Sequence, residues 1–296
     1  MSLYVKFWGT RGSLPTPASW TRIHGGNTAC VEIRTEDAIF ICDAGSGIRE
    51  LGKDIIQRTN APSKIHLFLS HTHWDHIQGF PFFPPAYFED STIYVYGVGE
   101  NDDENYKLLS GQMDSRYFPV VFSDLGAHVA PASLDPAGTE IDGVRISSFE
   151  LNHPGGCHAF RFEHKGIKII YASDQEIVPT ENDVFPDSNN EGPTRELPPE
   201  LVENCKDADL LIMDSQYNDE QYNTKRGWGH TSAFTATDLG VVAKARQLAL
   251  FHHDPESTDA QIELLVSECR NRANRMESDT FIFAAREGIE LKYKAR

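Results

Sequence analysis

The chain lacks the features of several common protein classes. Its five cysteines among 296 residues are odd in number and none forms a Cys-x-x-Cys pair, so we expect buried thiols and neither a disulfide framework nor a thiolate zinc site. No apolar run approaches the about 18 residues of a membrane-spanning helix. The N-terminal segment has no basic region followed by an apolar stretch, which predicts a cytoplasmic protein.

Basic residues are scarce relative to acidic ones. Lys and Arg number 27 and Asp and Glu 44, for a formal net charge of −17. A protein that binds a polyanion along its length usually carries a basic stripe, because phosphate neutralisation and counterion release supply most of the affinity. The acidic balance therefore favours a small substrate over a long nucleic acid.

No repeat or linker divides the chain, and its glycines form no nucleotide-binding fingerprint, so we expect a single domain over residues 1–296. Short apolar segments between turn residues predict strands, and apolar residues at helical spacing predict helices. The predicted strands are 4–8, 29–34, 38–42, 65–70, 92–96, 144–151, 159–164, 168–172, 209–213, 248–251 and 280–284, and the predicted helices are 48–58, 231–247 and 257–276.

Two longer stretches do not fit a single helix or strand. Residues 99–128 resemble a helical excursion, and residues 177–200, with five prolines, predict a long surface loop of the kind that often acts as a lid. A strand-rich chain in which helices arrive later predicts an α/β fold, an αββα sandwich of two mixed β-sheets flanked by helices.

The strongest chemical signal is the segment His71-Thr-His73-Trp-Asp75-His76, directly after a predicted strand. His71 and His73 are two residues apart and can point the same way from an extended segment, whereas Asp75 and His76 turn to a second side. One metal ion cannot comfortably take all four side chains, so we expect two divalent ions. Imidazole and carboxylate ligands without thiolate suit Zn²⁺ best, and also Mn²⁺, Fe or Co²⁺.

Three further candidates follow apolar strands in the same way: His153, Asp174 and His252. Each alone would be an ordinary turn residue. Beside a metal motif we interpret all three as ligands, with the Asp174 carboxylate shared between the two ions.

In this order, the motif and the three later residues resemble the metallo-β-lactamase superfamily over nearly the whole chain. The resemblance implies a two-sheet sandwich with a dinuclear metal site at the sheet edges. The β-lactam-hydrolysing enzymes commonly have cysteine where this chain has Asp174, whereas the phosphodiesterase and glyoxalase branches have aspartate, which argues against antibiotic hydrolysis. Asp43 resembles the superfamily's carboxylate that accepts a hydrogen bond from a metal-bound histidine, with an ordinary turn residue as the alternative.

Two segments are similar to the ribonuclease Z group: Leu211-Ile-Met-Asp214, with Asp where that group has Glu, and Gly229-His230-Thr-Ser, close to its Gly-His-Ser-Thr turn. The resemblance implies that His230 is the general acid and Asp214 orients it. The alternative is that His230 only caps the predicted helix that follows it. A helix N-terminus lowers an imidazole pKa, so we expect the Asp214 carboxylate to restore the protonated form.

We therefore expect a metal-dependent phosphodiesterase of small, cyclic nucleotide-like substrates. A hydroxide bridging the metals would attack phosphorus and His230 would protonate the leaving oxygen, with Asp75 completing the catalytic set. The expected partners are a phosphodiester substrate and a second copy of the chain in a homodimer, and neither a membrane nor a long nucleic acid. No cofactor besides the metals is expected.

Alternative functions remain. A tRNA 3′-end processing endonuclease is disfavoured by the acidic charge and by the lack of a basic, flexible arm. A non-catalytic ligand carrier on the same fold is disfavoured because all seven ligand candidates are present, and a thioester or lactone hydrolase leaves the acid pair unexplained. Tyr117, Phe118 and Trp228 could stack on a base, but we favour core packing for each.

Overall fold

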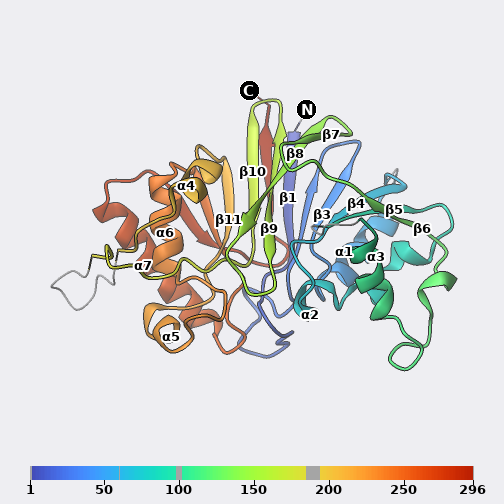
Figure 1. Cartoon of the computed structure of the whole chain (residues 1–296), viewed down its shortest axis with the longest axis horizontal. Helices are drawn as coiled ribbons and strands as arrows, with labels where there is room; N and C mark the ends of the chain where they lie inside the picture. The colour runs from blue at the N-terminus through green and yellow to red at the C-terminus, as the bar shows by residue number, and fades with distance from the viewer. Residues whose placement is uncertain (1, 60, 98–101, 185–193, 296) are drawn as a thin grey trace.

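The computed structural model describes residues 2–59, 61–97, 102–184 and 194–295. Two seven-stranded sheets pack face to face at its centre, and helices cover the outer faces (Figure 1). Each sheet is mixed, with an antiparallel part and a parallel part. The predicted αββα sandwich is confirmed.

The first sheet comes mainly from the N-terminal half and has the order β14-β1-β2-β3-β4-β5-β6. Pairing is antiparallel from β14 to β3 and parallel from β3 to β6. Its strands are β1 (Ser2–Gly9), β2 (Cys30–Arg34), β3 (Ile39–Cys42), β4 (Lys64–Phe68), β5 (Thr92–Tyr96), β6 (His128–Ala132) and β14 (Glu290–Lys294).

The second sheet has the order β13-β12-β11-β10-β9-β8-β7. Here pairing is parallel from β13 to β10 and antiparallel from β10 to β7. Its strands are β7 (Thr139–Ile141), β8 (Val144–Leu151), β9 (Cys157–His164), β10 (Ile167–Ala172), β11 (Leu210–Asp214), β12 (Gln247–Phe251) and β13 (Phe281–Ala284).

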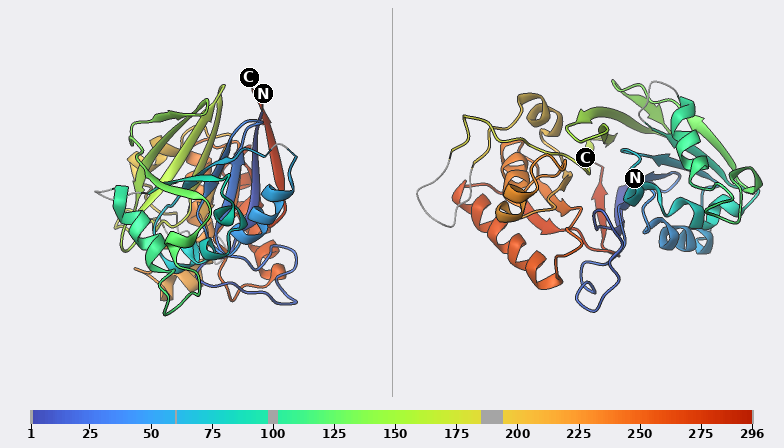
Figure 2. Two further views of the ribbon diagram at one scale, coloured as in Figure 1. Left: turned by 90° about the vertical axis from the view of Figure 1, so that its right-hand side faces the viewer. Right: turned by 60° about the horizontal axis from the view of Figure 1, so that its bottom comes forward.

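The helices lie on the two flanks of the sandwich (Figure 2). In the described part of the chain, no helix is both long enough and apolar enough to cross a membrane. The helices and 3-10 turns are α1 (Ile48–Gln57), α2 (Trp74–Ile77), η1 (Phe80–Phe82), η2 (Pro84–Tyr87), α3 (Asp102–Gly111), η3 (Phe122–Asp124), α4 (Pro199–Cys205), α5 (Asp219–Thr224), α6 (Ala233–Val242) and α7 (Asp259–Arg275).

Three apolar clusters hold these layers together. One lies between the sheets and includes Phe40, Phe68 and Phe162, each fully buried. Burying such a ring contributes about 1.5–3 kcal/mol relative to leaving it exposed. The other two clusters pack each sheet against its own helices. All five cysteines are buried and free, as the sequence predicted.

Three strands escaped prediction, and their sequences explain why. β6 contains a proline, Pro131, which a strand tolerates mainly at a sheet edge. β14 alternates charged and partly buried residues, as edge strands commonly do. β7 spans only three residues.

Two predicted helices differ from the structure. The helix predicted at 231–247 is shorter, because Ser232 caps α6 and the chain turns at Lys244, whose φ is 55°, before β12 begins. The predicted excursion at 99–128 forms α3 and η3, and its first residues, 99–101, lie outside the described residues.

In the predicted loop 177–200, the described residues form a single bridge between Val184 and Thr194, and α4 begins at Pro199. Residues 185–193, on which the idea of a lid chiefly depends, lie outside the described residues.

Candidate metal centre

The ends of several strands meet at one edge of the sandwich. β4, β8, β10 and β12 each end in an apolar run and deliver polar side chains one to three residues later. α2 begins directly after β4's loop and adds two more. The structure brings all seven predicted metal ligands together there: His71, His73, Asp75, His76, His153, Asp174 and His252.

Asp174 lies between two groups of histidines. Its Oδ2 is 3.6 Å from Nε2 of His71 and 3.7 Å from Nε2 of His153. Its Oδ1 is 3.2 Å from Nε2 of His76 and 3.4 Å from Nε2 of His252. A carboxylate that turns one oxygen to each group can serve both sites of a two-metal centre.

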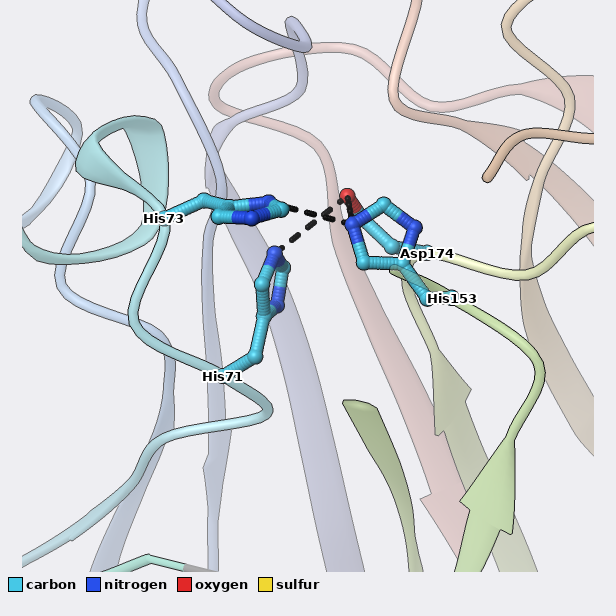
Figure 3. A group of neighbouring side chains, drawn as sticks. All are labelled: His71, His73, His153 and Asp174. Carbon is cyan, nitrogen blue, oxygen red and sulfur yellow. Dashed lines mark hydrogen bonds and ion pairs between the residues drawn. The ribbon is translucent and has the colours of Figure 1, made fainter. Parts of the chain in front are cut away.

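Donor atoms within each group are close enough to share one ion. Figure 3 shows the first group, His71 and His73 from the loop after β4 facing His153 and Asp174 from the second sheet. Nδ1 of His73 lies 3.1 Å from Nε2 of His153. The donor atoms of this group all lie within 4.8 Å of one another.

The second group contains Asp75, His76 and His252. Oδ2 of Asp75 is 3.1 Å from Nε2 of His252 and 3.2 Å from Nε2 of His76. The same oxygen accepts the backbone N–H of Ser13 at 2.7 Å, so the N-terminal loop helps to fix the carboxylate.

Protein acceptors orient four of the histidines. When Nδ1–H is donated to the protein, Nε2 is left with its lone pair toward the centre. The acceptor of Nδ1–H is Ser70 Oγ for His71 (3.1 Å) and Asp43 Oδ2 for His76 (2.7 Å). It is the Gly229 carbonyl for His153 (2.8 Å) and Gln216 Oε1 for His252 (2.8 Å).

The environment of these atoms fits metal cations. Nε2 of His71 is buried and has no hydrogen-bond partner among the described residues, a costly state unless a metal accepts its lone pair. Burial would lower the pKa of His76, but Asp174, Asp75 and Asp43 raise it well above its usual value. Three buried carboxylates thus require positive charge at this point, and divalent ions would supply it.

His230 lies beside this centre but is held by a different partner. Its Nδ1 is 2.8 Å from Oδ2 of Asp214 and 3.9 Å from Oδ2 of Asp174. Burial would lower the pKa of His230, whereas the charge and hydrogen bond of Asp214 raise it to about 9. The imidazole is therefore suited to carry a proton at neutral pH. A ring nitrogen of His230 also lies within 4.8 Å of possible metal-ligating atoms of Asp174 and His252. Proximity alone would therefore also allow His230 to bind a metal.

The helix after His230 does not use this side chain as its cap. The hydroxyl of Ser232 accepts the N–H of Thr235 at 3.3 Å and caps α6. The alternative interpretation of His230 as a helix cap is therefore wrong.

Sequence reasoning missed two residues that support the centre. Gln216 holds His252, and Glu176 accepts the backbone N–H groups of Gly227 and Gly229 at 2.8 Å and 3.0 Å. Each stands two residues after an aspartate near the end of a buried strand: Asp214 is the last residue of β11, and Asp174 lies two residues beyond β10. Polar residues at that offset were the available signal.

The expectation of core packing for three aromatic residues is wrong for two of them. Phe118 packs against the buried cluster beneath the first sheet. Tyr117 is 75% exposed and Trp228 is 62% exposed, so neither belongs to a core.

Comparisons with known proteins identify the family of this chain. The family model of the β-lactamase superfamily domain matches residues 39–253. Ribonuclease Z of Haloarcula marismortui is 23% identical over 320 residues, covering 99% of this chain and 97% of that protein.

Two solved structures share the fold. Human tRNase Z, short form, has a TM-score of 0.66 at 18% identity, and the alignment covers 99% of both chains. Unliganded yeast PDE1 has a TM-score of 0.65 at 15% identity, also with 99% of both chains covered. The family model covers most of the chain, which therefore belongs to the β-lactamase superfamily.

Proposed function

We propose that this protein is a dinuclear metal-dependent phosphodiesterase that acts on small, cyclic nucleotide-like phosphodiesters. The coarse class, a metal-dependent phosphodiester hydrolase, is supported by the family and by relatives named ribonuclease Z. The observation that carries the proposal is the position of Asp174 between two histidine groups, with the His230–Asp214 pair beside it.

His71, His73, His153 and Asp174 would hold one ion. Asp75, His76 and His252 would hold the other and share Asp174. Zn²⁺ is our proposal for both, because the donors are imidazoles and carboxylates. When bound, the ions supply an activated water and offset negative charge on the phosphoryl oxygens.

The chain's own residues would handle the leaving group. A ribose oxygen is a poor leaving group and needs a proton as the bond to phosphorus breaks. Since Nδ1 of His230 is bonded to Asp214, Nε2–H is the proton that His230 would donate. Asp214 is fully buried and keeps this imidazole protonated.

The charge of the chain supports the small substrate. A net charge of −17 works against the phosphate contacts that a tRNA requires. The second candidate, tRNA 3′-end processing, is favoured by the names of the relatives.

We retain the homodimer as a further proposal, to be tested by sedimentation.

A turnover screen with one metal-loaded preparation separates the two candidates. The panel should contain cyclic mononucleotides, cyclic dinucleotides, an aryl phosphodiester and precursor tRNA. Hydrolysis of at least one cyclic mononucleotide with little tRNA cleavage is expected. Efficient tRNA cleavage without cyclic nucleotide hydrolysis would replace the first candidate with the second.

A further inference from the structure

A buried carboxylate clamps the turn that precedes His230. Glu176 is 5% exposed, and its two oxygens accept the N–H groups of Gly227 and Gly229 at 2.8 Å and 3.0 Å. The hydroxyl of Tyr222 donates to the same carboxylate at 3.0 Å. Three donors satisfy the buried charge, so this turn is held by strong, charge-assisted hydrogen bonds.

The same turn is locked against the metal centre. Gly227 and Gly229 have φ of 80° and 89°, values that favour glycine. The carbonyl of Gly229 accepts Nδ1–H of His153 at 2.8 Å. A Cβ on Gly229 would lie 2.2 Å from that nitrogen, so no other residue fits there without moving His153.

Trp228 is the residue between these two glycines, and it is 62% exposed. The ammonium of Lys225 lies 5.9 Å from the centroid of its ring and forms an ion pair with Asp254 at 2.9 Å. An exposed tryptophan on a loose loop would need no explanation. Here the backbone N–H groups on both sides are held by the Glu176 carboxylate, and Trp228 is two residues before His230, so the position from which the ring extends is preorganised.

We propose that Trp228 is a stacking platform for the nucleobase of the substrate, held in place by Glu176. The inference rests on the proposed function, because His230 marks where the leaving oxygen must lie. A base joined to that oxygen through a ribose would reach the residues just before His230. Replacing a stacking aromatic residue by alanine typically weakens binding by about 5-fold to 150-fold per base.

The test measures ligand binding to the metal-loaded protein by isothermal titration calorimetry and by tryptophan fluorescence. The probes are adenosine and cytidine 5′-monophosphate, with ribose 5-phosphate as the matched ligand that lacks a base. At least one nucleotide should bind about tenfold or more tightly than ribose 5-phosphate and quench fluorescence. Trp228→Leu should remove this preference and leave ribose 5-phosphate binding unchanged, whereas Trp228→Phe should keep most of it.

Two exposed tryptophans serve as controls: Trp20 and Trp74, 54% and 77% exposed. Trp20→Leu and Trp74→Leu should both retain the preference. Loss of it in Trp74→Leu and not in Trp228→Leu overturns the assignment, as does the absence of any preference in the wild-type protein. For the clamp, Glu176→Gln should weaken binding of the nucleotide more than binding of ribose 5-phosphate, and a wild-type preference in that variant would contradict the role of Glu176.

Hydrolysis of bis(p-nitrophenyl) phosphate distinguishes this inference from the proposed function. A protein that hydrolyses the diester but shows no base preference contradicts only the stacking platform. A protein that binds nucleotides through Trp228 but hydrolyses no diester contradicts the proposed function instead.

Discussion

Nδ1 of His230 lies 2.8 Å from Oδ2 of Asp214, at the end of a fully buried strand. The same carboxylate accepts the N–H groups of Gln175 at 3.1 Å and Gln216 at 3.0 Å. These donors hold both oxygens of Asp214 in place, so the direction of the His230 ring is fixed. An acid used once per turnover benefits from such preorganisation, because little reorganisation is needed at the moment of reaction.

Replacing His230 by Ala should lower turnover on cyclic nucleotides by about 10²–10⁴-fold, the usual contribution of a general acid. The loss should shrink with bis(p-nitrophenyl) phosphate, whose leaving group needs no proton. Metal content, measured by elemental analysis, should be unchanged. Equal losses on both substrates together with loss of metal would make His230 a ligand.

Replacing Gln216 by Leu should weaken metal binding at the second group by about 10–100-fold, the effect typical of removing a ligand's hydrogen-bond partner. The reason is that Oε1 of Gln216 fixes His252 by accepting Nδ1–H at 2.8 Å. Gln216→Glu keeps an acceptor there and is the matched control. Competition with a chelator measures the affinity, and unchanged affinity in Gln216→Leu would show that His252 is oriented by other contacts.

A pair of glycine variants isolates the contact between the turn and His153. Gly227→Ala adds a Cβ that meets nothing within 4 Å, whereas in Gly229→Ala it would lie 2.2 Å from Nδ1 of His153. Both variants carry the same backbone strain, about 1–2 kcal/mol for a left-handed residue. Gly229→Ala should therefore lose metal affinity and activity in addition to stability. Thermal unfolding and metal analysis of both variants provide the comparison, and identical behaviour would show that His153 adapts freely.

The sequence predicted which residues meet at the edge of the sandwich better than it predicted the residues that hold them in place. His71, Asp174 and His252 follow apolar runs whose ends are visible in the sequence, and parallel strands bring such ends to one edge. Gln216 and Glu176 act on partners 36 and 53 residues away, with no local periodicity to connect them. Their roles depend on loop conformations that only the folded chain defines.

Metal stoichiometry tests the role of Asp174. Protein purified without chelator should contain close to two first-row metals per chain, at a separation of roughly 3.5–4 Å. Asp174→Asn should lower that content, because one oxygen is replaced by an amide nitrogen that cannot ligate. Chelation should lower the melting temperature, since a ligand at about 100 times its Kd adds about 2.7 kcal/mol to stability. A single well-occupied site in the wild-type protein, without contact to Asp75 and His252, would contradict the dinuclear centre.

Salt dependence distinguishes a small substrate from a tRNA. Binding of a long nucleic acid releases counterions, and a protein with 6–10 phosphate contacts loses about 10³–10⁵ in affinity between 50 and 200 mM salt. A cyclic mononucleotide carries one phosphate, and a chain with a net charge of −17 has few cations to spare for others. Initial rates over this salt range should therefore change only modestly with a cyclic nucleotide. Because Lys225 already forms an ion pair with Asp254, Lys225→Met should leave the salt dependence of the cyclic nucleotide rate nearly unchanged. A steep decline of precursor tRNA cleavage with salt, at rates above those for every cyclic nucleotide, would instead identify a nuclease.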